Sequence, residues 1–187
     1  SNLGRDKSAV VVFDIANGEE VEELYSHPDY DVGGVYFSRK DKKLTSASYT
    51  SWKRERHFFD EDTKKLFARI EKDLGDYEIG ITGMNKAEDV FIIRTYSDKS
   101  LGAYYIYDQN TDVLEKITDV SPWIDENEMA SVFPIQYQSR DGLTIHGYLT
   151  LPKGYALETA KYLPVVVNPH GGPWARDTWS MQWYFDC

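Results

Sequence analysis

A unit that recurs about every 46 residues constrains the fold of this 187-residue chain most strongly. Three segments place an aromatic residue before an aspartate, with Asn or Thr three positions later: Phe13-Asp14, Phe59-Asp60 and Tyr107-Asp108. Their aspartates lie 46 and 48 residues apart. Each copy suits a strand, a turn in which the Asp side chain caps backbone N–H groups, and a return strand. We expect the return strands to end at residues 24–25, 68–70 and 115–117.

Further strands fit the same period. Residues 32–38 correspond to residues 77–83, and residues 43–50 correspond to residues 89–97. Four short antiparallel strands in about 46 residues are the signature of a β-propeller blade. Residues 9–118 therefore predict half a blade and two full blades, and a β-sandwich with hairpins of similar length is the alternative. Because blades bury their faces only against neighbouring blades, we expect further blades upstream.

The polar residues of this half are expected to be structural. Asp14, Asp60 and Asp108 are interpreted as turn caps. The charged segment 53–57 is expected to be a solvated loop between strands. His57 has Asp60 and Asp62 nearby in sequence but no second close histidine, so no metal site is predicted.

Composition narrows the class of partner. The chain has 21 basic and 31 acidic residues and a formal charge of -10, which phosphate backbones and anionic lipids would repel. No apolar stretch approaches the roughly 18 residues of a membrane span. The single cysteine, Cys187, excludes an internal disulfide and a cysteine metal cluster. We therefore expect a soluble protein with no nucleic-acid partner, no membrane partner and no cofactor, and the choice between a cytoplasmic and a periplasmic location stays open.

The pattern changes after residue 119. Residues 121–131, with Ser121-Pro122-Trp123 and an acidic stretch at 125–128, are predicted to form a linker or short helix. Residues 132–138 and 143–151 then flank the turn Arg140-Asp141-Gly142, which indicates a hairpin. His146 falls beside Tyr148 on the face opposite the leucines, and we interpret it as an exposed or cross-strand residue.

An unbroken apolar run at residues 163–168 predicts a strand buried on both faces of a parallel or mixed sheet. It leads directly into His170-Gly171-Gly172-Pro173-Trp174. A glycine pair after such a strand leaves backbone N–H groups unshielded, as an oxyanion-stabilising loop requires. A plain turn is the alternative interpretation.

Several motifs together resemble the prolyl oligopeptidase family of serine peptidases, and most closely its dipeptidyl-peptidase and acylaminoacyl-peptidase branch. The resemblance spans about residues 119–179, and the upstream repeats agree with that family's N-terminal β-propeller. It is carried by Ser121-Pro122-Trp123, Met129-Ala130, Pro134-Ile135-Gln136-Tyr137, the segment 139–152 and the segment 170–177.

The resemblance implies a mostly β chain made of partial four-stranded propeller blades followed by the first strands of an α/β-hydrolase domain. It assigns residues 1–120 to the propeller, 121–131 to the linker and 132–187 to the hydrolase domain. It also implies that the parent protein hydrolyses short peptides, with the propeller excluding folded proteins. Whether that protein is an exopeptidase or an endopeptidase is not distinguished.

The resemblance implies roles for four residues. His170, Gly171 and Gly172 would flank the oxyanion, with Gly172 as the best candidate for an N–H donor. His170 stands where some relatives place a tyrosine whose hydroxyl assists, so a side-chain contribution from it is not expected. Trp174 lies near the substrate pocket of relatives, and a packing role is the alternative.

The nucleophile elbow of the family, Gly-x-Ser-x-Gly, occurs nowhere in the sequence. We therefore expect the nucleophile, acid and base to lie downstream and this chain alone to be inactive. The start at Ser1-Asn2-Leu3 suggests a processed or tag-derived end, and the aromatic run 183–187 suggests a cut. The alternatives are a non-catalytic propeller that binds peptides or proteins, and part of an α/β-hydrolase esterase. Residues 163–168 are expected to cause self-association or to pack on the blades.

Overall fold

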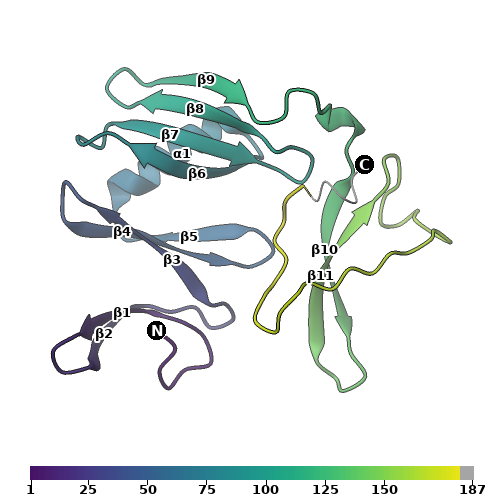
Figure 1. Cartoon of the computed structure of the whole chain (residues 1–187), viewed down its shortest axis with the longest axis horizontal. Helices are drawn as coiled ribbons and strands as arrows, with labels where there is room; N and C mark the ends of the chain where they lie inside the picture. Colours follow the sequence, from purple (N-terminus) through teal and green to yellow (C-terminus); the bar gives the residue numbers. More distant parts are fainter. Residues whose placement is uncertain (182–187) are drawn as a thin grey trace. The chain divides into compact units, whose positions relative to one another are not determined.

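The computed structural model describes residues 1–181, and within that range the strands form four separate antiparallel sheets (Figure 1). The chain is mostly β, as the repeats predict, and its small antiparallel sheets are consistent with a partial β-propeller. It divides into two compact units. The first comprises residues 1–75 and 85–89, and the second comprises residues 76–84 and those from 90 onward.

The first unit begins with the predicted half blade. Strand β1 (Val10–Asp14) pairs with β2 (Glu19–Tyr25). The next sheet has three strands in sequence order, β3 (Val32–Ser38), β4 (Lys43–Thr50) and β5 (Arg54–Phe58). The centre of β4 is buried, with Ala47 fully inaccessible. This sheet is one strand short of the full blade that the sequence predicts.

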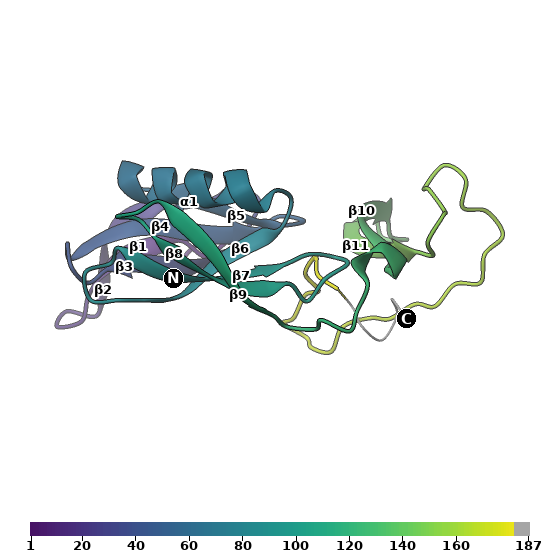
Figure 2. The same cartoon turned by 90° about the horizontal axis from the view of Figure 1, so that it is seen from above.

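A helix follows β5 where the return strand ending at residues 68–70 was expected, so that prediction is wrong. Helix α1 (Glu61–Leu74) begins at Asp60, whose carboxylate accepts hydrogen bonds from the Thr63 amide (2.8 Å) and hydroxyl (2.7 Å). Phe67 and Ile70 form its buried face, and Figure 2 shows the helix lying along β5. An Asp with a hydroxyl residue three positions later caps a helix as readily as a turn.

The charged segment 53–57, expected to be a solvated loop, instead forms most of β5, which pairs with β4 through Ser48 and Arg56. His57 is half-buried and stacks on Tyr25, with ring centroids 4.0 Å apart and an angle of 13° between the rings. The cross-strand partners and the aromatic contact stabilise a strand whose composition alone suggested solvent exposure.

The second unit contains the complete predicted blade. Strands β6 (Glu78–Met84), β7 (Val90–Tyr96), β8 (Ala103–Asp108) and β9 (Val113–Asp119) form one sheet in sequence order (Figure 1). Residues alternate in burial along β7, and Ile93 at its centre is inaccessible. Such alternation is the pattern of a central antiparallel strand.

The hairpins of both units share one turn geometry. In four of them, β1–β2, β3–β4, β6–β7 and β8–β9, the fourth residue after the first strand has a positive φ, close to the left-handed region: Gly18 (72°), Lys42 (53°), Glu88 (55°) and Asp112 (55°). Lys42 and Glu88 are 46 residues apart, which is the period seen in the sequence. The structural repeat is therefore carried by backbone conformation as well as by the aspartates.

A short connection leads from β9 to the last hairpin. It contains the 3-10 turn η1 (Glu126–Glu128), where the sequence predicts a linker or short helix. The Tyr77 hydroxyl donates to the Glu126 carboxylate over 2.5 Å, and burial together with this acidic partner raises the pKa of Tyr77. None of the helices among residues 1–181 combines the length and apolar character needed to cross a membrane.

Candidate functional site

The hairpin that precedes the glycine loop forms as predicted. Strand β10 (Ser131–Gln138) pairs with β11 (Thr144–Leu151) without a register shift. Gly142 has a φ of 87°, which favours glycine at the turn. Asp141 accepts hydrogen bonds from the Ser139 hydroxyl and the Leu143 amide, and these lower its pKa. His146 is exposed and lies opposite Gln136, in agreement with its expected cross-strand position.

The buried strand expected at residues 163–168 is absent from the structure. Val165, Val166 and Val167 are 78–82% exposed and belong to no strand, so the expectation that this run packs on the blades is also wrong. A strand buried on both faces needs a neighbouring strand and covering layers. Within residues 1–181, every strand pairs in one of the four antiparallel sheets, and none pairs with this run.

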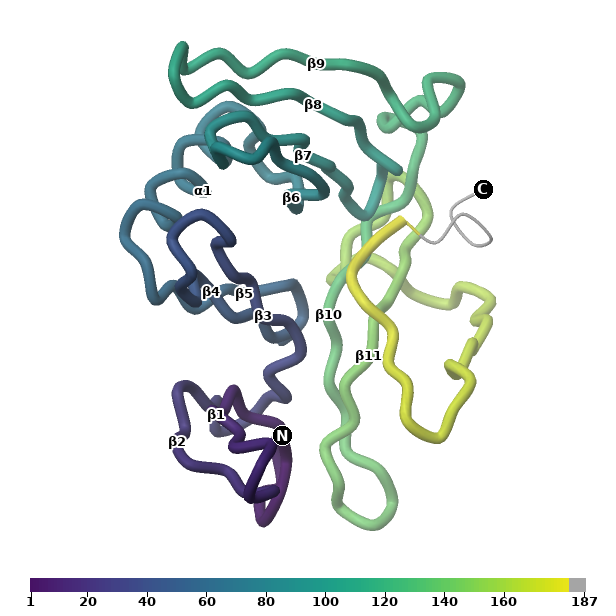
Figure 3. Tube along the Cα trace, turned by 60° about the vertical axis from the view of Figure 1, so that its left-hand side comes forward, coloured from purple at the N-terminus to yellow at the C-terminus, as the bar shows by residue number. Residues whose placement is uncertain are grey.

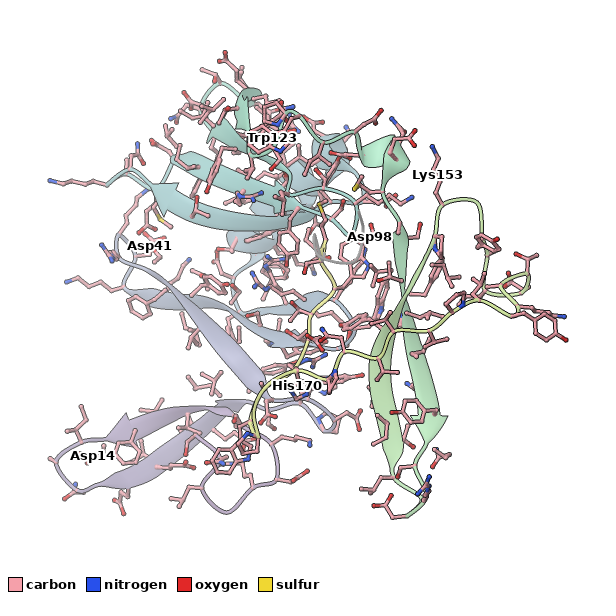
Figure 4. All side chains as sticks on the ribbon, turned by 45° about the vertical axis from the view of Figure 1, so that its right-hand side comes forward. Asp14, Asp41, Asp98, Trp123, Lys153 and His170 are labelled. Atoms are coloured by element: carbon pink, nitrogen blue, oxygen red, sulfur yellow. The ribbon has the colours of Figure 1, made fainter. Side chains whose placement is uncertain are left out.

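The predicted site residues lie together on the loop that follows. Figure 4 labels His170 on this loop. The His170 ring nitrogen Nδ1 lies 2.8 Å from the Gly171 carbonyl oxygen, so a protonated Nδ1 donates to it. The Ala175 amide donates to the Pro173 carbonyl over 3.2 Å. Trp174 is 99% exposed, so its side chain packs against no part of the described chain.

The two glycines keep their amides unshielded. Neither Gly171 nor Gly172 has a positive φ, so the backbone conformation does not itself require glycine here. A Cβ atom at Gly171 would meet nothing within 4 Å, and one at Gly172 would approach the Trp174 nitrogen to 3.4 Å. Among residues 1–181, neither amide has a hydrogen-bond acceptor. The loop therefore offers unpaired N–H donors to an external acceptor.

Two residues that bind the backbone of Val132, near the start of the β10–β11 hairpin, were not predicted from the sequence. Asp98, in the β7–β8 loop, accepts a hydrogen bond from the Val132 amide (2.9 Å). The Trp179 indole N–H donates to the Val132 carbonyl (3.2 Å), and Trp179 is only 7% exposed. No motif marks either residue, since their partner is backbone.

Metal ligation has no candidate in the part of the chain described. Groups of three or more His, Cys, Asp or Glu side chains that could hold a metal ion are absent from residues 1–181. Asp60 is engaged by Lys43 and Thr63, and His57 stacks on Tyr25. Cys187 and the aromatic run 183–187 lie outside the described residues.

Two curated proteins are similar to nearly the whole chain. Dipeptidyl aminopeptidase BIII of Pseudoxanthomonas mexicana is 26% identical over 97% of this chain. Dipeptidyl peptidase family member 6 of Caenorhabditis elegans is 21% identical over 93% of it. The chain spans only about a quarter of their length, 27% and 26% respectively. No protein-family model matches the chain.

Both similarities extend across the blade repeats as well as the glycine loop, and both relatives are named as dipeptidyl peptidases. They confirm the resemblance that the motifs of residues 119–179 predict. The chain is thus a relative of the dipeptidyl peptidases, consistent with that branch of the prolyl oligopeptidase family.

Proposed function

We propose that this chain is part of a serine peptidase that hydrolyses short peptides by acyl transfer, with its Ser, Asp and His triad outside these 187 residues. The observation that carries the proposal is the unpaired, unshielded Gly172 amide in a chain related to dipeptidyl peptidases. Residues 1–120 would belong to the propeller and residues 132–187 to the start of the hydrolase domain. The propeller would limit access to short peptides.

In this proposal the loop acts on charge that develops during the reaction. When a serine oxygen attacks the peptide carbonyl, the carbonyl oxygen becomes an oxyanion that needs N–H donors. The Gly172 amide would supply one donor. The second comes, in enzymes of this fold, from the residue after the nucleophile. Gly171 and His170 would hold the loop, since a protonated His170 Nδ1 donates to the Gly171 carbonyl.

Trp174 is proposed to contact the substrate. Its ring is fully exposed, and an aromatic side chain in that state offers a large apolar surface to a peptide side chain. Its neighbour Pro173 restricts the backbone before it. No other side chain among the described residues packs against this ring.

The chain alone should be inactive. It contains no Gly-x-Ser-x-Gly string, and a glycine loop without nucleophile or base retains no covalent route to hydrolysis.

A serine-reactive fluorophosphonate probe tests the proposal. The native protein would be captured from its source with an antibody against this chain after probe treatment. We expect a labelled product of about 70–80 kDa, the size of a propeller and a hydrolase domain at ordinary domain lengths. The isolated 187-residue chain should stay unlabelled. An unlabelled native product of the same mass as this chain would contradict the proposal and favour a non-catalytic binding propeller.

The role of Gly172 is tested by a matched pair of variants in the longer protein. Gly172→Pro removes the N–H, whereas Gly172→Ala keeps it at a position whose φ is not positive. Loss of one oxyanion donor lowers kcat about 100- to 1000-fold. We expect that loss for Gly172→Pro and a much smaller one for Gly172→Ala. Equal kcat values for the two variants would exclude Gly172 as the donor.

A further inference from the structure

One residue on the outer edge of β10, Val132, has hydrogen-bond partners outside the hairpin. Val132 lies opposite Thr150 in the hairpin, yet its own amide and carbonyl bind other partners. The amide donates to Asp98 Oδ2 at 2.9 Å, and the carbonyl accepts from Trp179 Nε1 at 3.2 Å. Val132 is only 6% exposed, so both hydrogen bonds form around a buried residue, where they are strongest.

A second contact joins two of these three segments, the β7–β8 loop and residues 179–181. The Met181 amide donates to the Ser97 carbonyl over 2.9 Å, one residue before Asp98. The residues around this junction are buried. Relative exposures are 7% for Trp179, 6% for Met181, 6% for Ala130, 7% for Ser100 and 5% for Leu151. Figure 4 shows Asp98 near the start of β10. A small apolar core therefore forms where the β7–β8 loop, β10 and residues 179–181 meet.

This junction closes a long loop. Leu151, at the end of β11, pairs with Ser131, while Trp179 binds the next residue, Val132. Residues 152–178 thus leave and return at the same point of β10, as the trace in Figure 3 shows. Within the glycine loop the hydrogen bonds join close neighbours, such as His170 with Gly171 and Pro173 with Ala175. The position of the loop therefore depends on its closure.

We propose that Trp179 and Asp98 are positioning residues for the glycine loop. The docked indole of Trp179 fixes where the loop returns, and Asp98 fixes the strand residue to which the indole binds. This inference rests on the proposed function, because it concerns where the Gly172 amide is held. A displacement of about 1 Å at a reacting centre is sufficient to lower a rate greatly. The docking of Trp179 therefore determines whether the Gly172 amide is held where the oxyanion forms.

Amide hydrogen exchange in the 187-residue chain tests the docking without any catalytic activity. Trp179→Phe keeps an aromatic ring but loses the indole N–H. We expect exchange at the Met181 amide to become about tenfold faster, the effect of losing one hydrogen bond. Gly171 and Gly172 resonances should also move. The matched control is Trp123→Phe, because Trp123 is 78% exposed and lies outside the glycine loop.

Two measurements keep the test independent of folding. Exchange at Ile93, in the centre of β7, reports whether the sheet is intact and should not change. Asp98→Asn retains a carbonyl oxygen that accepts from Val132, whereas Asp98→Ala does not. We expect normal Val132 exchange in the first variant and faster exchange in the second. Unchanged Met181 exchange in Trp179→Phe would overturn the inference.

Kinetics in the longer protein separate positioning from general stability. Trp179→Phe and Asp98→Ala should lower kcat and leave KM nearly constant, because the loop acts on the transition state. Asp98→Asn should retain most of the kcat of the unsubstituted protein, and Trp123→Phe should have the same kcat as that protein. An active protein whose kcat is insensitive to Trp179 and Asp98 refutes only this inference. Absence of probe labelling in the unsubstituted protein refutes the proposed function instead.

Discussion

Asp60 has two kinds of partner at the start of α1. Its carboxylate caps the helix through Thr63 and also accepts a hydrogen bond from the Lys43 ammonium at 2.7 Å. The Lys43 hydrogen bond, followed by those of Thr63, lowers the pKa of Asp60 from 3.8 to about 2. The side chain is 15% exposed, whereas Lys43 is 45% exposed. The helix cap is therefore the larger contribution to stability, since exposed ion pairs contribute little.

We predict that Asp60→Ala lowers the free energy of unfolding by about 1 kcal/mol at neutral pH. Because the folded-state pKa is depressed, this contribution is complete above the unfolded value of 3.8 and disappears as the pH falls toward 2. Urea unfolding of both proteins at pH 7 and near pH 2 measures it. Asp62→Ala is the control, since Asp62 is 82% exposed. A difference that persists at pH 2 would contradict this account.

Asp14 accepts hydrogen bonds from both residues of Asn17-Gly18, a dipeptide that is sensitive to deamidation. Its Oδ2 accepts from the side-chain nitrogen Nδ2 of Asn17 at 2.6 Å, and its backbone carbonyl accepts from the Gly18 amide at 2.8 Å. Deamidation requires the Gly18 nitrogen to attack Cγ of Asn17, with ammonia leaving and water opening the succinimide to aspartate or isoaspartate. Both hydrogen bonds oppose that attack.

We predict that Asp14→Ala increases deamidation at Asn17 several-fold, because it frees the Asn17 side chain. Mass spectrometry of the peptide that contains Asn17-Gly18, after incubation at neutral pH, measures the product. Asp108→Ala is the matched control, since Asp108 caps the β8–β9 turn by accepting from the Asn110 amide and lies far from Asn17 in sequence. Equal deamidation rates in the two variants would show that Asp14 gives no protection.

Among the elements, the junction of β7 and β8 has the strictest requirement for one residue type. Gly102 has a φ of 71°, and a Cβ atom there would lie 2.1 Å from the Thr95 carbonyl oxygen. Thr95 in turn binds the Ala103 amide through its hydroxyl at 2.9 Å. The two nearest atoms belong to the Thr95 backbone and not to a flexible side chain, so they cannot move away from an added Cβ atom.

We predict that Gly102→Ala destabilises the chain by more than about 2 kcal/mol, from the combined clash and left-handed strain. Gly80→Ala in β6 is the control, because nothing lies within 4 Å of its Cβ position and its φ is not positive. It should change stability by roughly 0.5 kcal/mol. Chemical denaturation measures both, and a similar loss in the two variants would refute the steric explanation.

The sequence predicts the elements that are governed by local periodicity. The half blade, the complete blade and the β10–β11 hairpin all form, because alternation and turn residues specify them locally. Helix α1 was missed because Asp60 and Thr63 fit a turn cap and a helix cap equally well. Strand β5 was missed because charged residues hid a strand that cross-strand contacts stabilise, including the stacking of His57 on Tyr25.

The candidate site likewise has one part that the sequence predicts and another that it does not. The string from His170 to Trp174 identifies the glycine loop directly, since its chemistry is local. Asp98 and Trp179 bind the backbone of Val132, a partner distant in sequence that no motif encodes. The burial of residues 163–168 was wrongly predicted because an apolar run specifies that a segment can be buried, but not which layers bury it.

At the scale of the whole molecule, two properties oppose each other. Val165, Val166 and Val167 form an exposed, uncharged run with high β propensity, and such a run favours pairing with another chain. The net charge of -10 repels a second copy. Salt screens that repulsion but leaves the apolar contact, so the balance depends on ionic strength.

We predict that the 187-residue chain self-associates in a concentration-dependent way and that added salt strengthens the association. Light scattering across a concentration series at low and high salt measures the mass. Val166→Asp should keep the chain monomeric, because it introduces a charge into the exposed run. Ile15→Asp adds the same charge at a residue that is 90% exposed in the β1–β2 turn, and it should associate like the unsubstituted chain. A monomer at every concentration, or equal loss in both variants, would show that residues 163–168 are not the contact.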